Sequence, residues 1–366
     1  MTPSTLLNST AEQHQILIIG GGAAGITVAA QLRAQNSQLD IAIVEPSDMH
    51  YYQPAWTLVG GGQYRIEDTA KPESLCIPPG VKWIQDYIAD LNPDDNTAIT
   101  RQGKVLRYSY LVVCPGIQID WHLIDGLKDA LGKGGVCSNY AFDSAPYTWE
   151  TLRNFKGGTA LFTFPGTPIK CGGAPQKIMY LADDTFRQAG VRDRTQVVYC
   201  TATPGIFPVP AYAERLLKVV ERRGIQVNYK HNLKAIRPDV KEAVFAVTTD
   251  SGVQDVTIPY DIIHVTPPMS APDFIKNSKL AVTEGPTKGW VDVNKDTLQH
   301  NVYANVFSLG DASSLPTSKT AAAIRRQAPV LVENLLAAIA SFPLSGQYDG
   351  YTCCPLITGY GKTIMA

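Results

Sequence analysis

The sequence predicts an α/β fold made of two parallel-sheet units, the second inserted in the first, with an added C-terminal segment. Three observations favour this class. A strand, a glycine-rich turn and a helix follow one another at residues 14–35, a second strand and turn begin near residue 158, and a late strand ends in Gly-Asp at residues 310–311. At 366 residues the chain is long enough to bury two cores.

The expected boundaries follow these patterns. We assign residues 1–151 to the first part of a dinucleotide-binding domain and residues 152–285 to an inserted, second Rossmann-like domain. Residues 286–342 return to the first domain, and residues 343–366 form the C-terminal segment. Each boundary lies between predicted strands and helices, where sequence patterns are least exact.

Composition excludes several function classes. With 32 basic and 33 acidic residues, the chain lacks the positive surface that nucleic-acid binding requires, so no nucleic-acid partner is expected. The seven cysteines are odd in number and irregularly spaced, which favours neither a disulfide framework nor a zinc site, and no metal is predicted. No signal or transit peptide is visible at the N-terminus. The longest apolar stretch, residues 328–342, is too short and too interrupted to span a bilayer.

The first glycine-rich turn has the features of a dinucleotide-binding loop. Gly20, Gly22 and Gly25 follow an apolar strand in a G-x-G-x-x-G pattern. The first glycine makes the tight turn, the second lets backbone approach a pyrophosphate, and the third lets helix pack on strand. Amides of Ala23 and Ala24 would open the helix whose positive end faces the phosphates.

An acidic residue stands at the distance that such a loop requires. The strand "DIAIVE" ends in Glu45, 20 residues after the last glycine of the loop. Its carboxylate is expected to accept hydrogen bonds from ribose hydroxyls. The loop alone does not separate FAD from NAD.

The late strand favours FAD. It ends in Gly310 and Asp311, and a helix with small residues on its first turns is expected from about Thr317. In flavoproteins with two dinucleotide domains, such a Gly-Asp contacts the ribityl chain and pyrophosphate of FAD. The following helix would direct its positive end at the pyrimidine edge of the flavin, where it stabilises negative charge.

The second unit departs from a nucleotide-binding pattern in two ways. "PGTPIKCGG" spaces its glycines wrongly, and the next strand ends in Cys200 and Thr201 without an acidic residue for a ribose. Cys171 stands where a phosphate would otherwise lie. We interpret this loop as an entry point for electrons from a thiol. The alternative is a small apolar residue in a turn. A second cysteine beside it would decide, and the candidates lie in "YDGYTCCPLITGYGK".

Three segments together resemble one family. "FPGTPIKCGGAPQKIMYLADD", "LGDASSLPTSKTAAA" and "YDGYTCCPLITGY" are similar to the sulfide:quinone oxidoreductases, in the type II branch that includes the mitochondrial enzyme. The resemblance runs from Gln15 to Lys362. It implies a flavoprotein that holds FAD and two redox cysteines and passes electrons to a membrane quinone.

The resemblance assigns roles to individual residues. It implies that Cys171 is the redox cysteine nearest the flavin and that Cys354 is its partner, with Cys353 in the place of a family serine. On physical grounds, we expect that Lys170, or the positive end of the helix that begins near Ala174, favours a thiolate at Cys171. The positions that the resemblance places at the cofactor, besides the glycine loop and Asp311, are Gln53, Ile88, Lys319, Ala321 and Ala322.

The resemblance also implies a reaction and its partners. Hydrogen sulfide is oxidised to persulfide or polysulfide sulfur at Cys171 and Cys354, and electrons pass through FAD to a membrane quinone. Sulfite, glutathione or a second sulfide would take the sulfur, and a homo-oligomer is left open. We expect peripheral attachment to the cytoplasmic face of a bacterial membrane. The alternative function is a type II NADH:quinone oxidoreductase of the same fold.

Overall fold

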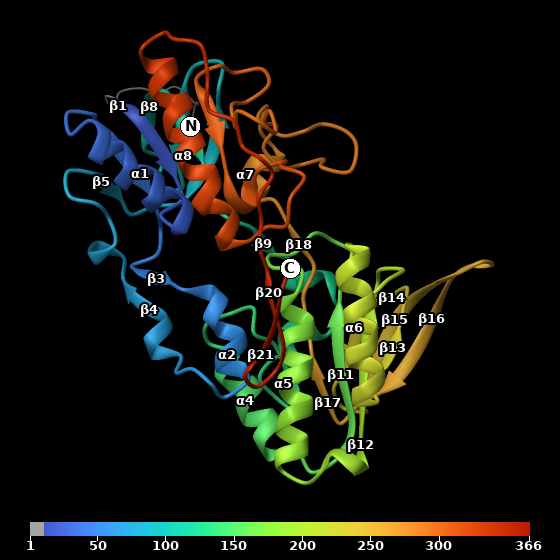
Figure 1. The fold of residues 1–366 in the computed structure, drawn as a ribbon. Coiled ribbons are helices and arrows are strands. Elements are labelled where there is room, and N and C mark those ends of the chain that lie inside the picture. Colours follow the sequence, from blue (N-terminus) through green and yellow to red (C-terminus); the bar gives the residue numbers. More distant parts are fainter. Residues whose placement is uncertain (1–10) are drawn as a thin grey trace, which may run out of the picture. The chain divides into compact units, whose positions relative to one another are not determined.

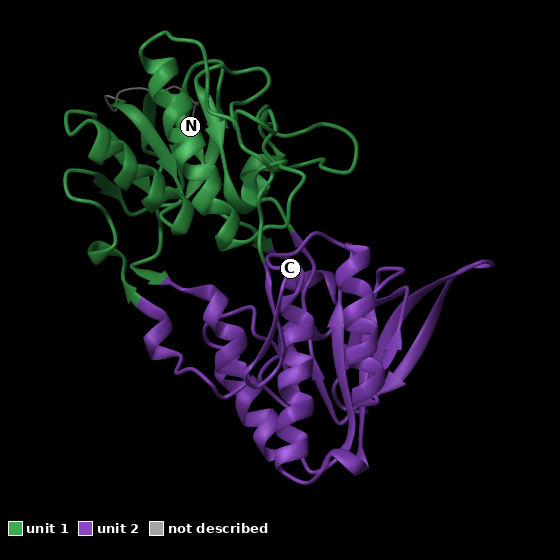
Figure 2. Ribbon diagram, viewed as in Figure 1, with its two compact units in different colours: residues 1–50, 71–118, 270–353 green, residues 51–70, 119–269, 354–366 purple. Residues whose placement is uncertain are grey.

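The structure is a computed structural model of the 366-residue chain and describes residues 11–366. The chain divides into two compact units, which Figure 2 colours green and purple. Unit 1 comprises the residues up to 50 together with 71–118 and 270–353, and unit 2 comprises 51–70, 119–269 and 354–366. These units group residues by proximity, so the boundaries drawn from the sequence pattern at 151, 285 and 342 stay a prediction.

Unit 1 is built on a seven-stranded sheet with the strand order β5-β2-β1-β8-β7-β6, in which β19 also pairs with β8. Strand β1 pairs in parallel with β2 and β8, whereas β7 pairs with β8 in antiparallel. The C-terminal parts of the two central strands, Ile16–Ile19 of β1 and Leu111–Val113 of β8, are continuously apolar and buried, as expected for parallel strands covered on both faces. The strands are β1 (Glu12–Ile19), β2 (Ile41–Val44), β5 (Lys82–Ile84), β6 (Ile88–Asn92), β7 (Thr97–Thr100), β8 (Val105–Val113) and β19 (Val306–Ser308).

Helices α1 (Ala23–Gln35), α7 (Asp273–Lys276) and α8 (Ala321–Ile339) belong to unit 1. Helix α8 starts later than the expected Thr317. The reason is the cap, because the Thr320 hydroxyl accepts a hydrogen bond from the Ala323 amide at 3.2 Å and so fixes the first turn. Thr317, Ser318 and Thr320 are all residues that can cap, and the sequence did not distinguish among them.

Unit 2 contains a five-stranded parallel sheet of order β10-β17-β11-β12-β13 and a three-stranded antiparallel sheet of order β14-β15-β16. The parallel sheet buries one apolar cluster on each face. Its strands are β10 (Val136–Cys137), β11 (Gly158–Phe164), β12 (Thr195–Thr201), β13 (Gln226–Asn228) and β17 (Ile262–His264). The antiparallel strands are β14 (His231–Arg237), β15 (Glu242–Thr249) and β16 (Gly252–Pro259).

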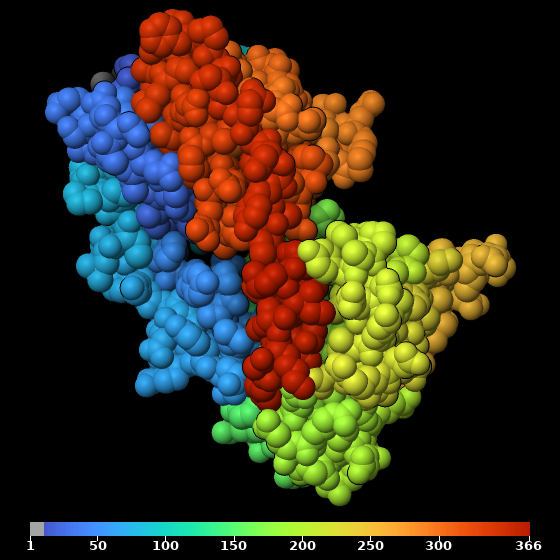
Figure 3. Space-filling view, viewed as in Figure 1, coloured from blue at the N-terminus to red at the C-terminus, as the bar shows by residue number. Residues whose placement is uncertain are grey.

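One face of the parallel sheet is covered by helices and by the C-terminal hairpin. Strand β20 (Pro355–Gly359) runs along α5 and pairs with β21 (Lys362–Met365) (Figure 1). Figure 3 shows this hairpin in dark red on the surface beside α6. The helices of unit 2 are α2 (Trp56–Gly60), α3 (Leu127–Ala130), α4 (Ala145–Asn154), α5 (Ala174–Gln188) and α6 (Pro210–Arg223).

Short strands mark the places where the chain passes from one unit to the other: β3 (Met49–Tyr51), β4 (Ala70–Pro72), β9 (Gln118–Ile119) and β18 (Met269–Ser270). Within residues 11–366, no helix has both the length and the apolar character needed to cross a bilayer.

Candidate active site

Cys171 and Cys354 lie side by side in unit 2, although 183 residues separate them in the sequence. Their sulfur atoms are 3.2 Å apart, and both thiols are free. This separation is longer than the S–S bond of about 2.05 Å, yet it is within hydrogen-bond distance for sulfur. The sulfur that approaches Cys171 is that of Cys354, and the neighbouring Cys353 is a half-buried free thiol.

The loop between β11 and α5 presents Cys171. Cys171 has a φ of +57°, in the left-handed region that few residues other than glycine adopt. Its carbonyl accepts a hydrogen bond from the Ala174 amide at 2.8 Å, at the start of α5. A side chain at Gly173 would meet the Cys354 sulfur at 2.7 Å and Leu356 at 2.4 Å. Glycine at position 173 therefore lets the hairpin approach the loop closely.

A buried lysine sits beside the two sulfur atoms. Lys177 is 8% exposed, and its Nζ lies 3.3 Å from the Cys171 sulfur. Hydrogen bonding from Cys354 lowers the pKa of Cys171 most, and the charge of Lys177 lowers it further, although burial acts in the opposite direction. The same pairing, together with burial, raises the pKa of Cys354. Cys171 is therefore the thiol that carries the negative charge.

Lys177 was not predicted from the sequence, which indicated Lys170 or the start of α5 as the group that favours the thiolate. The Lys170 ammonium instead donates to the Gln53 side chain at 2.5 Å and lies 5.6 Å from the ring of Trp56. The sequence did contain a signal for Lys177. It lies six residues after Cys171, on the first turn of the predicted helix, and so close to the loop that carries the cysteine. The expectation for α5 agrees with the structure in one respect, since the Gly173 amide acts on the Cys171 sulfur to lower its pKa.

Unit 2 also buries two further polar side chains, His264 and Tyr140. His264 is 2% exposed, and its Nε2 accepts from the Asn139 amide at 3.1 Å. Burial lowers the pKa of His264 to about 3, so the ring is neutral. Burial also raises the pKa of Tyr140, and the neighbouring Cys171 and Cys354 raise it further. Neither His264 Nδ1 nor the Tyr140 hydroxyl has a hydrogen-bond partner among the described residues.

The glycine loop lies in unit 1, between β1 and α1. Gly25 packs so tightly that a side chain would come within 1.9 Å of the Gly20 carbonyl, whereas a side chain on Gly22 would meet nothing within 4 Å. Helix α1 begins at Ala23 with no side-chain cap and no acidic residue in its first turn. The amides of Ala23 and Ala24 therefore lie at an uncapped helix end of the kind that binds phosphate.

Glu45 lies where β2 ends, against the glycine loop. Its carboxylate accepts from the Gly21 amide at 2.8 Å and from the Ser47 amide at 2.9 Å. Burial raises its pKa, and those two hydrogen bonds act in the opposite direction. A second carboxylate, Glu73, was not predicted. It is 1% exposed, its Oε1 has no hydrogen-bond partner among the described residues, and its Oε2 lies 3.4 Å from His50.

A cavity of about 500 Å³ opens beside the glycine loop within unit 1. Gly20, Glu45 and Ile88, three of the predicted cofactor residues, line it together with Tyr87 and Arg101. A cavity of this size, beside an uncapped helix end and a buried carboxylate, fits the adenosine end of FAD.

The remaining predicted cofactor residues of unit 1 lie around the start of α8. Gly310 has a φ of +71°, and its amide donates to the Gln327 side chain at 2.9 Å. The Lys319 ammonium donates to the carbonyls of Asp311 and Ser313 and lies 3.7 Å from the ring of Trp290. Burial lowers the pKa of Lys319 to about 8. Ala321 and Ala322 form the first turn of α8.

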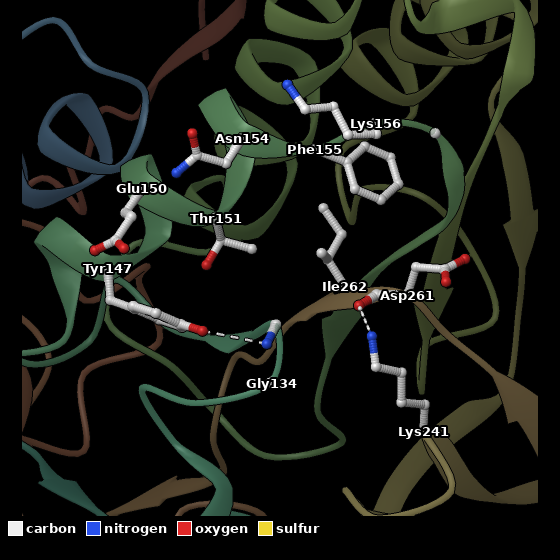
Figure 4. Close-up of a pocket in the computed structure, with 12 residues that line it drawn as sticks. Gly134, Tyr147, Glu150, Thr151, Asn154, Phe155, Lys156, Lys241, Asp261 and Ile262 are labelled. Atoms are coloured by element: carbon white, nitrogen blue, oxygen red, sulfur yellow. Dashed lines mark hydrogen bonds between the residues drawn. The ribbon is translucent and has the colours of Figure 1, made fainter.

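Of the predicted residues, Gln53, Cys171 and Cys354 lie in unit 2, and the others lie in unit 1. Another hollow of unit 2, of about 350 Å³, contains none of them (Figure 4). It lies where β11 and β17 begin, and Lys241 donates there to the Asp261 carbonyl at 3.4 Å. Among residues 11–366, no cluster of His, Cys, Asp and Glu could hold a metal ion.

Comparisons with known proteins agree with this arrangement. Residues 14–145 match the family described as pyridine nucleotide-disulphide oxidoreductase. The chain is 47% identical over 358 residues to the mitochondrial sulfide:quinone oxidoreductase of Mus musculus, which covers 98% of this chain and 78% of the relative. It is 49% identical over 354 residues to the protein of the same name from Dictyostelium discoideum, which covers 96% of this chain and 77% of the relative.

A solved structure supports the fold class. The sulfide:quinone oxidoreductase of the hyperthermophilic bacterium Aquifex aeolicus aligns with a TM-score of 0.76 and 21% identity, over 91% of this chain and 78% of that one. At this identity the likeness concerns the fold alone. Together with the family match, it confirms the predicted α/β class with two Rossmann-like units.

Proposed function

The chain belongs to the sulfide:quinone oxidoreductase family, and on that basis we propose that it is a flavoprotein enzyme that oxidises hydrogen sulfide and reduces a quinone. The observation that carries the proposal is the 3.2 Å approach of Cys171 to Cys354 with Lys177 beside them. A thiol pair beside a buried cation favours thiol–disulfide exchange, because the cation stabilises the thiolate form of one sulfur.

FAD is the cofactor, and the residues of unit 1 that would hold it are those of the glycine loop, Glu45, Ile88 and the start of α8. When bound, FAD supplies two-electron transfer between sulfur and quinone. The protein contributes the uncapped amides of Ala23 and Ala24 for the pyrophosphate and the Glu45 carboxylate for the ribose. Before the start of α8, the Lys319 ammonium donates to the Asp311 carbonyl.

The first step is an exchange at the oxidised cysteine pair. Hydrosulfide forms a bond to the Cys354 sulfur, the bond between Cys354 and Cys171 breaks, and Cys171 leaves as a thiolate. The sulfur of lower pKa leaves faster, and the contacts of Cys171 lower its pKa. The Lys177 ammonium, 3.3 Å away, stabilises the negative charge that develops on the leaving sulfur.

The second step regenerates the pair. A small nucleophile takes the outer sulfur of the Cys354 persulfide and leaves a Cys354 thiolate. The two thiolates then lose one electron pair as their bond re-forms, and that pair is the one that the quinone finally receives. Sulfite, glutathione and a second sulfide are the acceptors that we propose for the sulfur, and a homo-oligomer stays open.

The alternative of an NADH:quinone oxidoreductase has less support. Strand β12 ends at Thr201 without a carboxylate for a nicotinamide dinucleotide ribose, as the sequence indicated. The relatives of 47% and 49% identity are both named for sulfide and quinone.

We propose that the chain contacts a quinone-containing membrane peripherally. From the sequence we expected the cytoplasmic face of a bacterial membrane. The relatives from Mus musculus and Dictyostelium discoideum are both named as mitochondrial, and they favour a membrane of an organelle instead.

Serine substitutions test the assignment of the cysteine pair. Cys171→Ser and Cys354→Ser should each lower sulfide-dependent quinone reduction by at least about a thousandfold, because each removes one sulfur of the exchange. FAD absorbance should be retained in both variants. Cys353→Ser is the matched control and should keep activity within about twofold of the parent enzyme. Retained activity in either of the first two variants would contradict the assignment.

A further inference from the structure

The C-terminal hairpin of unit 2, which carries Cys354 at its start, is fixed at its far end by charged groups. The Asp184 carboxylate accepts two hydrogen bonds, one from Arg223 Nη1 at 2.6 Å and one from the Tyr360 amide at 2.8 Å. Arg223 Nη2 donates to the Thr358 carbonyl at 2.6 Å. The turn between β20 and β21 is thus held to the end of α5 and to α6.

The Tyr360 side chain adds a second attachment. Its hydroxyl donates to the Gly61 carbonyl at 2.6 Å and pairs with the Thr185 hydroxyl at 2.9 Å. Gly61 follows α2, and Thr185 lies on α5 beside Asp184. Asp184, Arg223 and Tyr360 together are called the tail anchor below.

The tail anchor is stiffly supported. Arg223 is 8% exposed, and it also pairs with Asp183, which is fully buried, at 2.6 Å. Asp183 in turn binds Arg187 at 2.9 Å and Arg192. Buried charges with several partners hold one geometry, because leaving any of them unpaired carries a large desolvation penalty.

Backbone hydrogen bonds and packing along the hairpin connect the tail anchor to Cys354. The peptide groups of Cys354 and Ala366 exchange two hydrogen bonds, at 2.7 and 3.2 Å, so the hairpin is closed at the cysteine. Leu356 is fully buried within unit 2, and a side chain at position 173 would have no room between the hairpin and the Cys171 loop. Cys354 therefore has a fixed place directly before β20, and the far end of that strand is held by the charged groups of the tail anchor.

We propose that the tail anchor is a positioning device that sets the effective concentration of the Cys354 thiol at Cys171. This inference rests on the proposed redox role of the two cysteines. During each turnover the pair is open until its bond re-forms, and in that interval only the hairpin holds the two sulfur atoms together. Well-oriented groups in one molecule react as if present at very high concentration, and that advantage falls when one of them gains freedom.

The tail anchor should affect the open and closed pair differently. In the disulfide, the covalent bond itself holds the hairpin at α5. In the dithiol, only the tail anchor holds the hairpin at α5. Weakening the tail anchor therefore increases the conformational freedom of the hairpin in the dithiol alone. This stabilises the dithiol relative to the disulfide and slows closure of the pair. A group with a merely structural role would destabilise both forms equally and leave their ratio unchanged.

The experiment measures the dithiol–disulfide equilibrium of Cys171 and Cys354 in the FAD-loaded enzyme against mixtures of reduced and oxidised glutathione. Alkylation and mass analysis report the ratio. One oxidised glutathione is reduced to two thiols for each cysteine pair that closes, so the electrons balance. Asp184→Asn should shift the equilibrium towards the dithiol by about tenfold, the factor for losing one charge-assisted hydrogen bond. A tenfold change corresponds to about 30 mV.

Tyr360→Phe is the second variant, because it keeps the backbone and the Asp184–Arg223 pair and removes only the hydroxyl contacts. It should shift the same equilibrium by about threefold to fivefold. It also tests the inference if Asp184→Asn does not fold.

Two control variants separate positioning from stability. Val198→Ala removes buried volume on the opposite face of the parallel sheet, and it should lower the melting temperature without shifting the equilibrium. Glu214→Gln removes one charge from an exposed pair with Lys218 on α6 and should change neither property.

The outcomes distinguish the two proposals. A shift in the tail-anchor variants, with none in the controls, supports the inference. An unchanged equilibrium in folded Asp184→Asn and Tyr360→Phe overturns the tail anchor and leaves the cysteine assignment intact. If the parent enzyme forms no reversible bond between Cys171 and Cys354, the proposed function fails and the inference fails with it.

Discussion

At the scale of single residues, the hydrogen bond with Cys354 and the charge of the buried Lys177, whose Nζ is 3.3 Å from the Cys171 sulfur, together lower the pKa of Cys171. Lys177 carries its charge in spite of burial, because the two thiols raise its pKa against the effect of desolvation. In such surroundings a charge acts more strongly than it would at the surface. Lys170 is nearer to Cys171 in the sequence, but its ammonium donates a hydrogen bond to Gln53 and lies over the ring of Trp56.

This difference between two lysines gives a prediction. Lys177→Met should raise the pKa of Cys171 by at least about one, since a charge that favours the thiolate is lost. The thiolate fraction would then begin to fall at a higher pH than in the parent enzyme. The alkylation rate of the reduced enzyme, measured as a function of pH, reports this pKa directly.

Lys170→Met is the matched control for that measurement. It removes an ammonium one residue from Cys171 and should leave the alkylation profile in place. Lys177→Arg, which keeps the positive charge, should recover most of the effect. A Lys170→Met profile shifted as far as that of Lys177→Met would mean that neither contact is specific.

At the scale of elements, the turn between β1 and α1 shows how one short motif combines packing and binding. Gly25 is needed by the protein itself, because a side chain there would collide with the Gly20 carbonyl. Gly22 has open space around it and an ordinary φ of −68°. We therefore expect that glycine at position 22 is needed for close approach of the FAD pyrophosphate and not for packing of the protein.

The two glycines are expected to respond differently to alanine. Gly22→Ala should leave the melting temperature of the apoprotein within about 2 °C of the parent, since no atom blocks a methyl group. It should weaken FAD binding by at least about tenfold, because the methyl group lies where the pyrophosphate approaches. Calorimetry of the apoprotein and fluorescence titration with FAD check both values. Gly25→Ala should lower the melting temperature markedly. Equal stability losses in the two variants would contradict this division of roles.

Elements with strong local signals were predictable from the sequence. The glycine loop, Glu45 after β2, and the loop that carries Cys171 before α5 all lie where the patterns placed them, because turn chemistry and strand periodicity are local. The start of α8 was predicted three to four residues too early, since several hydroxyl residues there can cap a helix. Glu73 gave no signal, because a single buried acid in a three-residue 3-10 helix has no periodicity.

At the scale of the whole chain, the pairing of Cys171 with Cys354 could not be derived from spacing, because the two cysteines are 183 positions apart in the sequence. Resemblance to a family supplied the pair, and the structure shows the contacts that hold the hairpin in place. Asp184, Arg223 and Tyr360 come from three distant segments, and each taken alone resembles an ordinary surface or helix residue. Long-range polar networks of this kind become visible only in three dimensions.

The central claim is that electrons enter through these cysteines from sulfide and not from a nicotinamide. It is tested most directly by mixing the anaerobic, FAD-loaded enzyme with sulfide or with NADH and following flavin absorbance. Sulfide should bleach the flavin, a soluble quinone should restore the flavin absorbance, and NADH should have no effect. Bleaching by NADH with no response to sulfide would contradict the account, because the loop around Cys171 would then bind a nucleotide instead of acting as a thiol pair.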